Sequence, residues 1–200
     1  MPELLSALPT LALFALLGYG LGSIPFGIVI ARLMGLGDLR QIGSGNIGAT
    51  NVLRTGNKPA AAATLILDSG KGAIAVLLAR LMAPEDAVQL AGLAAFLGHC
   101  FPVWLAFKGG KGVATFLGLL LALAWPVGIA ACLSWLAGAA LTRISSAAAL
   151  VAAASSILWA WLFAPAAIVL CAALAAIVYW RHAANIQRIL KGTEPKIGKK

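Results

Sequence analysis

Charged residues are scarce in this sequence, and acidic residues are the scarcest. Of the 200 residues 10% are charged, with 6 Asp and Glu against 15 Lys and Arg, whereas 62% are hydrophobic. A soluble globular domain has about a quarter of its residues charged, so this composition excludes that class. The apolar composition also leaves no stretch for a second, hydrophilic domain. We therefore expect residues 1–200 to form a single polytopic membrane domain.

Residues that build metal, thiol and serine-nucleophile sites are equally sparse. Cys100, Cys132 and Cys171 lie in apolar stretches without Cys-x-x-Cys spacing, and we expect them to be small buried side chains rather than disulfides or metal ligands. No cluster of acidic residues could hold Mg²⁺, and no Gly-x-Ser-x-Gly elbow occurs. The sequence therefore predicts a site without a metal ion or other cofactor.

Long apolar runs make up most of the chain. A helix needs about 20 apolar residues to cross a bilayer, and five runs are expected to do so: Pro9–Leu33, Pro59–Met82, Ala87–Phe107, Ser146–Phe163 and Pro165–Trp180. The first run tolerates Pro25 within it. It lacks the basic flank and the Ala-x-Ala exit of a cleavable signal peptide, so we interpret it as a membrane span.

The stretch Val113–Thr142 is ambiguous, because it fits either one long span or two short ones hinged at Trp125-Pro126. Basic residues flank it on both sides, and the positive-inside rule places them on one face of the membrane. Two spans satisfy this rule and one does not. We therefore predict a seven-transmembrane helical bundle with the N-terminus outside and the C-terminus cytoplasmic. The net charge of +9 then reflects membrane orientation, and we expect no nucleic acid partner.

Four short polar stretches separate the apolar runs, and in this topology all four face the cytoplasm. They are Gly43–Asn51, Phe107–Gly112, Arg181–Asn185 and Gly192–Glu194. Glycine-rich backbone lets consecutive N–H groups converge on an anion, and adjacent basic side chains neutralise it. Phosphate-binding loops at a membrane surface indicate chemistry that joins a phosphorylated polar molecule to an apolar one.

The first stretch matches the spacing Gly-x-Gly-x-x-Gly at Gly43, Gly45 and Gly48. A dinucleotide fold would need a preceding strand, whereas a membrane helix and a polar loop precede this motif, so we reject that interpretation. The glycines are expected to form an anion-binding nest, and the alternative is a flexible interhelical loop. The residues expected to donate hydrogen bonds or charge are Ser44, Asn46, Thr50, Asn51 and Arg54.

The second stretch, Lys108-Gly109-Gly110-Lys111-Gly112, leads directly into an apolar run. This places up to three glycine N–H groups and two lysines at a helix N-terminus, where the helix dipole favours an anion. The spacing is not that of a P-loop. The alternative is that ordinary positive-inside lysines lie on a flexible turn.

Asp68, Lys71 and His99 are ionisable candidates inside expected spans. Asp68 and Lys71 share a helix face because they are three residues apart. Charges at that depth face the protein interior in pairs, so the pair is either a substrate or proton group or a structural ion pair. His99 approaches the cytoplasmic end of its span, where a structural hydrogen bond is the main interpretation and a catalytic base the alternative.

The C-terminal motifs hold the remaining candidates. His182 and Asn185 have i,i+3 spacing just past the last span, so both face the same surface, in either a functional or a structural role. Glu194 is the only acid on the inner tail and would either orient a basic ligand residue or cap a turn. Neither histidine is followed at the right spacing by Asp, which excludes the His-x4-Asp dyad of the commonest glycerolipid acyltransferases.

At these residues the chain resembles the bacterial integral-membrane acyl-phosphate:glycerol-3-phosphate acyltransferases, over nearly its whole length. The family's motifs occur in order as Gly22–Pro25, Ser44–Asn51, Asp68 with Lys71-Gly72, Gly98–Pro102, Phe107–Gly112, Arg181-His182 with Asn185-Ile186, and Gly192–Glu194. Trp104 and Ala106 stand where the family often carries Phe and Gly.

The resemblance implies seven spans and transfer of an acyl group from acyl phosphate to the 1-hydroxyl of glycerol 3-phosphate. The products would be lysophosphatidic acid and inorganic phosphate, in the first step of phospholipid synthesis. The family uses neither acyl-CoA nor acyl carrier protein directly. We expect a monomer in contact with membrane lipid, located in the bacterial cytoplasmic (inner) membrane with its active site on the cytoplasmic face.

Residue roles follow from the motifs and the two phosphorylated substrates. We assign catalysis on the glycerol 3-phosphate side to Ser44, Arg54, Lys111, His182 and Asn185. Substrate binding is assigned to Gly45, Asn46, Thr50, Asn51, Lys108, Gly109, Gly110, Gly112 and Glu194. No residue is an obvious general base, so a substrate phosphate oxygen takes the hydroxyl proton, with His182 as the alternative. The competing function is an organophosphate transporter. Two observations argue against it: the polar motifs all lie on one face, and the sequence shows no inverted repeat.

Overall fold

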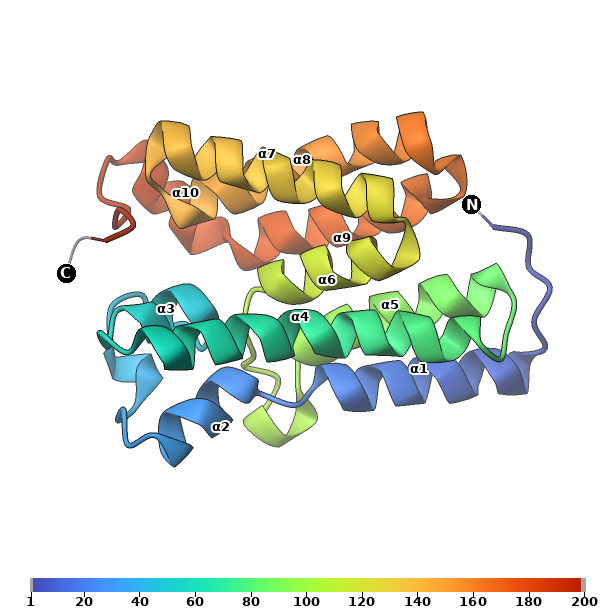
Figure 1. The fold of residues 1–200 in the computed structure, drawn as a ribbon, viewed down its shortest axis with the longest axis horizontal. Coiled ribbons are helices and arrows are strands. Elements are labelled where there is room, and N and C mark those ends of the chain that lie inside the picture. Colours follow the sequence, from blue (N-terminus) through green and yellow to red (C-terminus); the bar gives the residue numbers. More distant parts are fainter. Residues whose placement is uncertain (1, 199–200) are drawn as a thin grey trace.

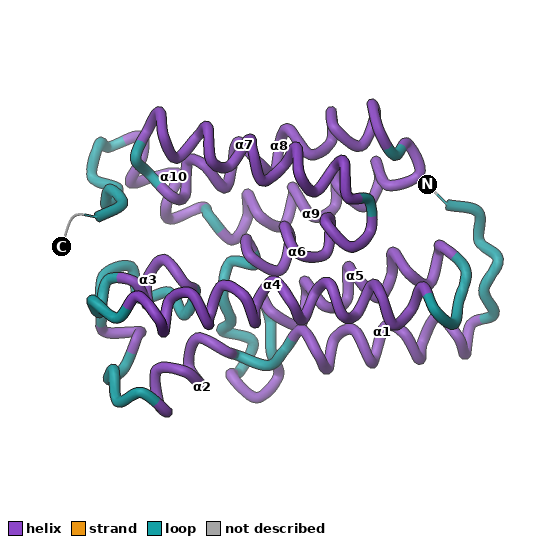
Figure 2. The backbone as a smooth tube through the Cα atoms, viewed as in Figure 1, coloured by secondary structure: helices purple, strands orange, loops and turns teal. Residues whose placement is uncertain are grey.

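Helices account for most of residues 2–198, the part of the chain that the computed structural model describes, and no strand occurs in that range (Figures 1 and 2). The α-helices are α1 (Leu8–Gly22), α2 (Phe26–Leu33), α3 (Ala49–Leu53), α4 (Lys58–Arg80), α5 (Glu85–Cys100), α6 (Val113–Leu123), α7 (Trp125–Thr142), α8 (Ser145–Phe163), α9 (Ile168–Arg181) and α10 (Ala183–Leu190). This architecture agrees with the rejection of a dinucleotide-binding fold.

Several helical segments are long and apolar enough to cross a membrane. Five qualify within the described residues: Leu8–Leu33, Lys58–Arg80, Glu85–Leu105, Trp125–Thr142 and Ser145–Phe163. The segment of α9 is a sixth if it is counted together with α10, from which it is bent by 63°. The expected all-α membrane architecture is therefore confirmed.

The first span contains a break in its helix at Pro25. Pro25 lacks an N–H group and disfavours helical backbone at Ile24, so α1 ends at Gly22 and α2 begins at Phe26. The carbonyl of Ile24, which helix breakage exposes, accepts a hydrogen bond of 2.7 Å from Lys71 Nζ. The expected span through Pro25 is nevertheless confirmed, because Leu8–Leu33 qualifies as one span despite the break in its helix.

The helices form two layers with α6 between them. In Figure 1, α1 to α5 lie in one layer and α7 to α10 in the other. Glycines bring α1 against α5: Gly18 and Gly22 lie on the backbone of Ala91 and Ala95, where an added Cβ would collide with the carbonyl oxygens. Since lipid gives helices no hydrophobic reason to associate, such close backbone packing is a main source of stability.

The ambiguous stretch from residue 113 to 142 is two helices, as its flanking charges predict. The break lies at Ala124, before Trp125-Pro126, and Figure 1 shows that α7 doubles back along α6. The longer α7 therefore runs past the start of α6, toward the end of the bundle that holds α3 and α10. At the opposite end, Arg80 donates hydrogen bonds to the carbonyls of Ala122 and Leu123 and so satisfies the C-terminus of α6.

Candidate active site

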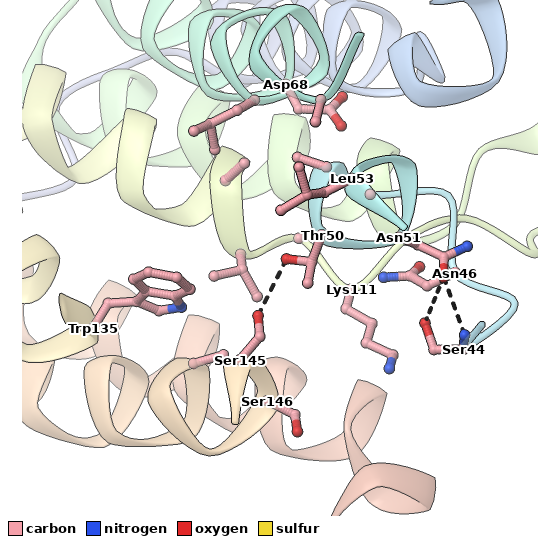
Figure 3. Close-up of a pocket in the computed structure, with 18 of the residues that line it drawn as sticks. Ser44, Asn46, Thr50, Asn51, Leu53, Asp68, Lys111, Trp135, Ser145 and Ser146 are labelled. Carbon is pink, nitrogen blue, oxygen red and sulfur yellow. Dashed lines mark hydrogen bonds between the residues drawn. The ribbon is translucent and has the colours of Figure 1, made fainter. Parts of the chain in front are cut away.

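A cavity of about 650 Å³ opens between the two layers (Figure 3). Residues from α3 and α10 contribute to its lining, and Figure 1 shows these two helices at the same end of the bundle. Ten of the predicted site residues line it: Ser44, Asn46, Thr50, Asn51, Arg54, Lys111, Gly112, His182, Asn185 and Glu194. Motifs that lie far apart in the sequence are thus brought to one place. Gly45, Lys108, Gly109 and Gly110 are not among the lining residues.

The loop before α3 is held together by Asn51, which is 1% exposed. Its Oδ1 accepts hydrogen bonds from the N–H and hydroxyl of Ser44, at 3.1 and 3.3 Å, and from Arg54 Nη1 at 3.3 Å. Its Nδ2 donates to the carbonyl of Leu39 at 2.8 Å. Because both polar atoms are already bonded to protein, Asn51 shapes the loop and places Ser44 and Arg54 at the cavity wall.

Lys111 belongs to a chain of polar contacts that joins the glycine loop to the C-terminal tail. Its Nζ donates to Asn185 Oδ1, and Asn185 Nδ2 donates to Glu194 Oε1 at 2.5 Å. Glu194 also accepts hydrogen bonds from Ser146 Oγ at 2.7 Å and Arg188 Nε at 2.6 Å. Glu194 therefore orients basic and amide groups, which is one of the two roles that the sequence allowed.

The electrostatics around Lys111 favour an anion in the cavity. Burial is the main cause that lowers the pKa of Lys111 to about 8, against the opposing carboxylate of Glu194. The guanidinium groups of Arg188, Arg181 and Arg54 lower it further. Three guanidinium groups and one ammonium thus face a single carboxylate. A substrate phosphate would balance this excess of positive charge.

His182 lies at the bend between α9 and α10 and is 2% exposed. Its Nδ1 lies 2.7 Å from the carbonyl of Val178, an acceptor, so Nδ1 carries the hydrogen and donates it. This arrangement leaves Nε2 as the free ring nitrogen. Together with Asn185 it lines the cavity, as the i,i+3 spacing predicts.

The glycines of the Lys108–Gly112 loop fasten the loop to neighbouring helices. The N–H groups of Gly109 and Gly110 donate to the carbonyls of Cys100 and His99, both at 3.1 Å. Their own carbonyls accept hydrogen bonds from Arg181, at 3.0 and 3.2 Å. Those two N–H groups are therefore committed to α5, and the residues that open α6, Gly112 with φ of 81° and the two after it, face the cavity instead.

The structure brings in cavity residues that the sequence analysis missed. Ser145 Oγ lies 3.2 Å from Thr50 Oγ1 and joins the two layers across the cavity (Figure 3). Its neighbour Ser146 binds Glu194. In the sequence, these two residues could have been noticed as a pair of serines that follows Arg143 at the start of an apolar run. Of the three cysteines, Cys100 and Cys171 are buried as expected, whereas Cys132 is partly exposed and lines the cavity.

Apolar residues line much of the rest of the cavity, among them Leu65, Leu117, Trp135 and Leu136. The remaining lining also includes Lys58, Asp68 and His99. In Figure 3, Trp135 lies on one side of Thr50 and Ser145, while Ser44 and Asn46 lie on the other. The cavity thus joins a cationic region to an apolar one. Among residues 2–198, no group of three or more His, Cys, Asp and Glu could hold a metal ion.

Comparison with known proteins gives a consistent result. The family model described as glycerol-3-phosphate acyltransferase matches residues 12–192. The glycerol-3-phosphate acyltransferase of Ruegeria pomeroyi is 69% identical over 191 residues, covering 95% of this chain and 94% of the relative. That of Jannaschia sp. is 70% identical over 190 residues, covering 94% of each chain.

Two crystal structures of PlsY (YgiH), an integral membrane glycerol 3-phosphate acyltransferase, share the fold. The glycerol 3-phosphate form has a TM-score of 0.88 at 38% identity and covers 94% of this chain and 96% of its own. The lysophosphatidic acid form has a TM-score of 0.85 at 36% identity, covering 94% and 95%. The match of fold, motifs and sequence over nearly the full length shows that the chain belongs to the glycerol-3-phosphate acyltransferase family.

Proposed function

We propose that this protein transfers a fatty acyl group from acyl phosphate to the 1-hydroxyl of glycerol 3-phosphate, giving lysophosphatidic acid and inorganic phosphate. The observation that supports this most directly is the cavity itself, because its cationic region suits two phosphates and its apolar region suits an acyl chain. Family membership supports the acceptor and the reaction class. The identity of the donor is our inference from the small, phosphate-binding character of the loops.

Acyl phosphate is already activated, so positioning and charge neutralisation account for most of the catalysis. In our proposal Ser44, Arg54, Lys111, His182 and Asn185 hold glycerol 3-phosphate. The 1-hydroxyl oxygen attacks the acyl carbonyl, an ester bond forms, and the bond from carbonyl carbon to phosphate oxygen breaks. The hydroxyl proton passes to a phosphate oxygen, and the phosphate leaves. His182 Nε2 is the alternative proton acceptor.

Donor choice is the first test of this proposal. We expect palmitoyl phosphate to be used at a rate at least about a hundredfold above that of palmitoyl-CoA, because the cavity loops offer no domain for an adenine nucleotide. The measurement is lysophosphatidic acid formation by detergent-solubilised protein with each donor at equal concentration. Comparable rates with both donors would remove the acyl-phosphate assignment while leaving the acceptor unchanged.

We further propose seven crossings, formed by α1 with α2, α4, α5, α6, α7, α8 and α9, in a bacterial inner membrane. In this topology the N-terminus is outside, the tail is cytoplasmic, and the cavity opens on the cytoplasmic face of a monomer. The α6 helix has 11 residues and is about 16 Å long, so local bilayer thinning has to accompany its crossing.

Cysteine labelling tests this topology. Single cysteines at Met82, Trp125 and Thr142, all exposed, are introduced into a variant that lacks the three native cysteines. An impermeant maleimide added to intact cells is expected to label the first two and spare Thr142→Cys, because Thr142 ends α7 beside the basic Arg143. The same reagent on opened membranes should label all three. Labelling of Thr142→Cys in intact cells would contradict the two crossings.

A further inference from the structure

His99 is a buried histidine in the last turn of α5 whose role the chemistry above does not use. It is 6% exposed and lies in a cluster with Asp68 and Lys71, at 2% and 3%. Lys71 Nζ lies 2.8 Å from Asp68 Oδ1 and donates to the carbonyl of Ile24 at the break in the first span. The ion pair with Asp68 and the hydrogen bond to Ile24 therefore account for Lys71, as a charge inside a membrane requires.

Hydrogen bonding does not account for His99 in the same way. Its Nδ1 lies 3.6 Å from Asp68 Oδ1, which is beyond hydrogen-bond distance. Within residues 2–198 this buried nitrogen has no hydrogen-bond partner. Leaving a buried polar group unbonded costs about 1–3 kcal/mol. His99 also lines the cavity, and its ring makes a further contact with the glycine loop.

The ring of His99 packs against Gly110. A Cβ built on Gly110 would collide with Nε2 of the imidazole and would lie 3.0 and 3.1 Å from Cε1 and Cδ2. The backbone adds to this contact, since the Gly110 N–H donates to the His99 carbonyl at 3.1 Å. From the other side, Arg181 Nε donates to the Gly110 carbonyl at 3.2 Å. Gly110 is thus held between His99 and Arg181.

The residue after Gly110 is Lys111, whose ammonium donates to Asn185 in the cavity. A shift of the Gly110 backbone would move Lys111 directly, because one peptide bond joins them. We propose that His99 is a positioning residue, whose imidazole fixes Gly110 and thereby aims the Lys111 ammonium into the cavity. This inference rests on the proposed function in one respect, namely that Lys111 holds a substrate phosphate.

Size complementation tests the contact. Gly110→Ala is expected to lower kcat/KM by at least about tenfold, because the new methyl group displaces the loop, and His99→Ala should do the same by releasing it. The double variant should regain at least about fivefold over Gly110→Ala, since the methyl group then occupies space that the imidazole has left. Gly70→Ala is the matched control, because a Cβ there meets nothing within 4 Å.

The pH profile separates positioning from loss of folded protein. The charged groups that face Lys111 are Glu194, Arg188, Arg181 and Arg54. In native protein the alkaline limb of kcat/KM is expected near pH 8, where Lys111 loses its proton. Burial is the main cause of that low value, so a released loop in His99→Ala should hydrate Lys111 and move the limb to higher pH. A destabilised but correctly arranged enzyme would keep the limb in place.

Failure of the proposed function can be told apart from failure of this inference, because native protein would then form no product. If native protein is active, multiplicative losses in the double variant or an unmoved alkaline limb in His99→Ala would overturn the inference. If His99→Ala does not fold, His99→Asn replaces it in the same cycle, because Asn lacks the ring atoms that face Gly110. Thermal unfolding in detergent identifies the folded variants.

Discussion

Replacing Lys111 with alanine is expected to reduce kcat/KM by about tenfold to about 150-fold while leaving folded, extractable protein. The ammonium is partly buried among Asn185, Glu194 and three arginines, and it would bind phosphate in a site from which much of the water is excluded. Charge-assisted hydrogen bonds to such groups contribute about 1.5–3 kcal/mol, which corresponds to this range of rates. The measurement is initial-rate kinetics with glycerol 3-phosphate as the varied substrate.

Two variants sharpen the result. Lys111→Arg keeps the charge but replaces a compact ammonium with a planar fork, so we expect partial activity at most. Lys191→Ala removes an exposed lysine from the C-terminal tail and should leave the rate near native, which controls for net charge. Native kinetics in Lys111→Ala would remove Lys111 from the site.

Replacing Glu194 with glutamine is expected to have the second largest effect, and its signature is a shift in pH dependence. Partial burial acts to raise the pKa of Glu194, but hydrogen bonds from Ser146, Asn185 and Arg188 hold it below its ordinary value, so Glu194 is a carboxylate at neutral pH. That carboxylate supports the protonated form of Lys111. Without it, the surrounding guanidinium groups lower the Lys111 pKa further below about 8.

Lys111 is charged below its pKa and neutral above it, so activity that needs the charge falls as pH rises through that value. Glu194→Gln should therefore lose at least about tenfold at pH 8 and less at pH 6.5, with its alkaline limb displaced to lower pH. Glu85→Gln, at the opposite end of the bundle, is the matched control. An alkaline limb that stays in place would show that Glu194 does not act on Lys111.

Much of the architecture could be predicted from the sequence, because its strongest signals are local. Apolar length identified the spans, and the basic residues at both ends of the Val113–Thr142 stretch identified its two helices. Pro25 was the exception. Its effect depends on whether the freed carbonyl of Ile24 finds a partner, and that partner is Lys71, 47 residues away along the chain.

The motifs of the site could be predicted from the sequence, but the role of each residue within them was harder to predict. Glycine and lysine at a helix start indicate an anion site, yet composition does not tell which N–H groups are already bonded within the protein. The N–H groups of Gly109 and Gly110 are already hydrogen-bonded to carbonyls of α5. Ser145 could not be found from its own segment, because its importance comes from Thr50 on the opposite layer. Tertiary contacts of this kind leave no periodic pattern in the sequence.

The most direct test of the central claim is the stoichiometry of the reaction in purified, detergent-solubilised protein. Radiolabelled glycerol 3-phosphate and palmitoyl phosphate are supplied without a membrane gradient, and lysophosphatidic acid and inorganic phosphate are measured together. We predict that both products appear at a ratio of one to one, that neither forms without glycerol 3-phosphate, and that Lys111→Ala greatly reduces both. Phosphate release independent of glycerol 3-phosphate, or no lysophosphatidic acid from native protein, would contradict the account.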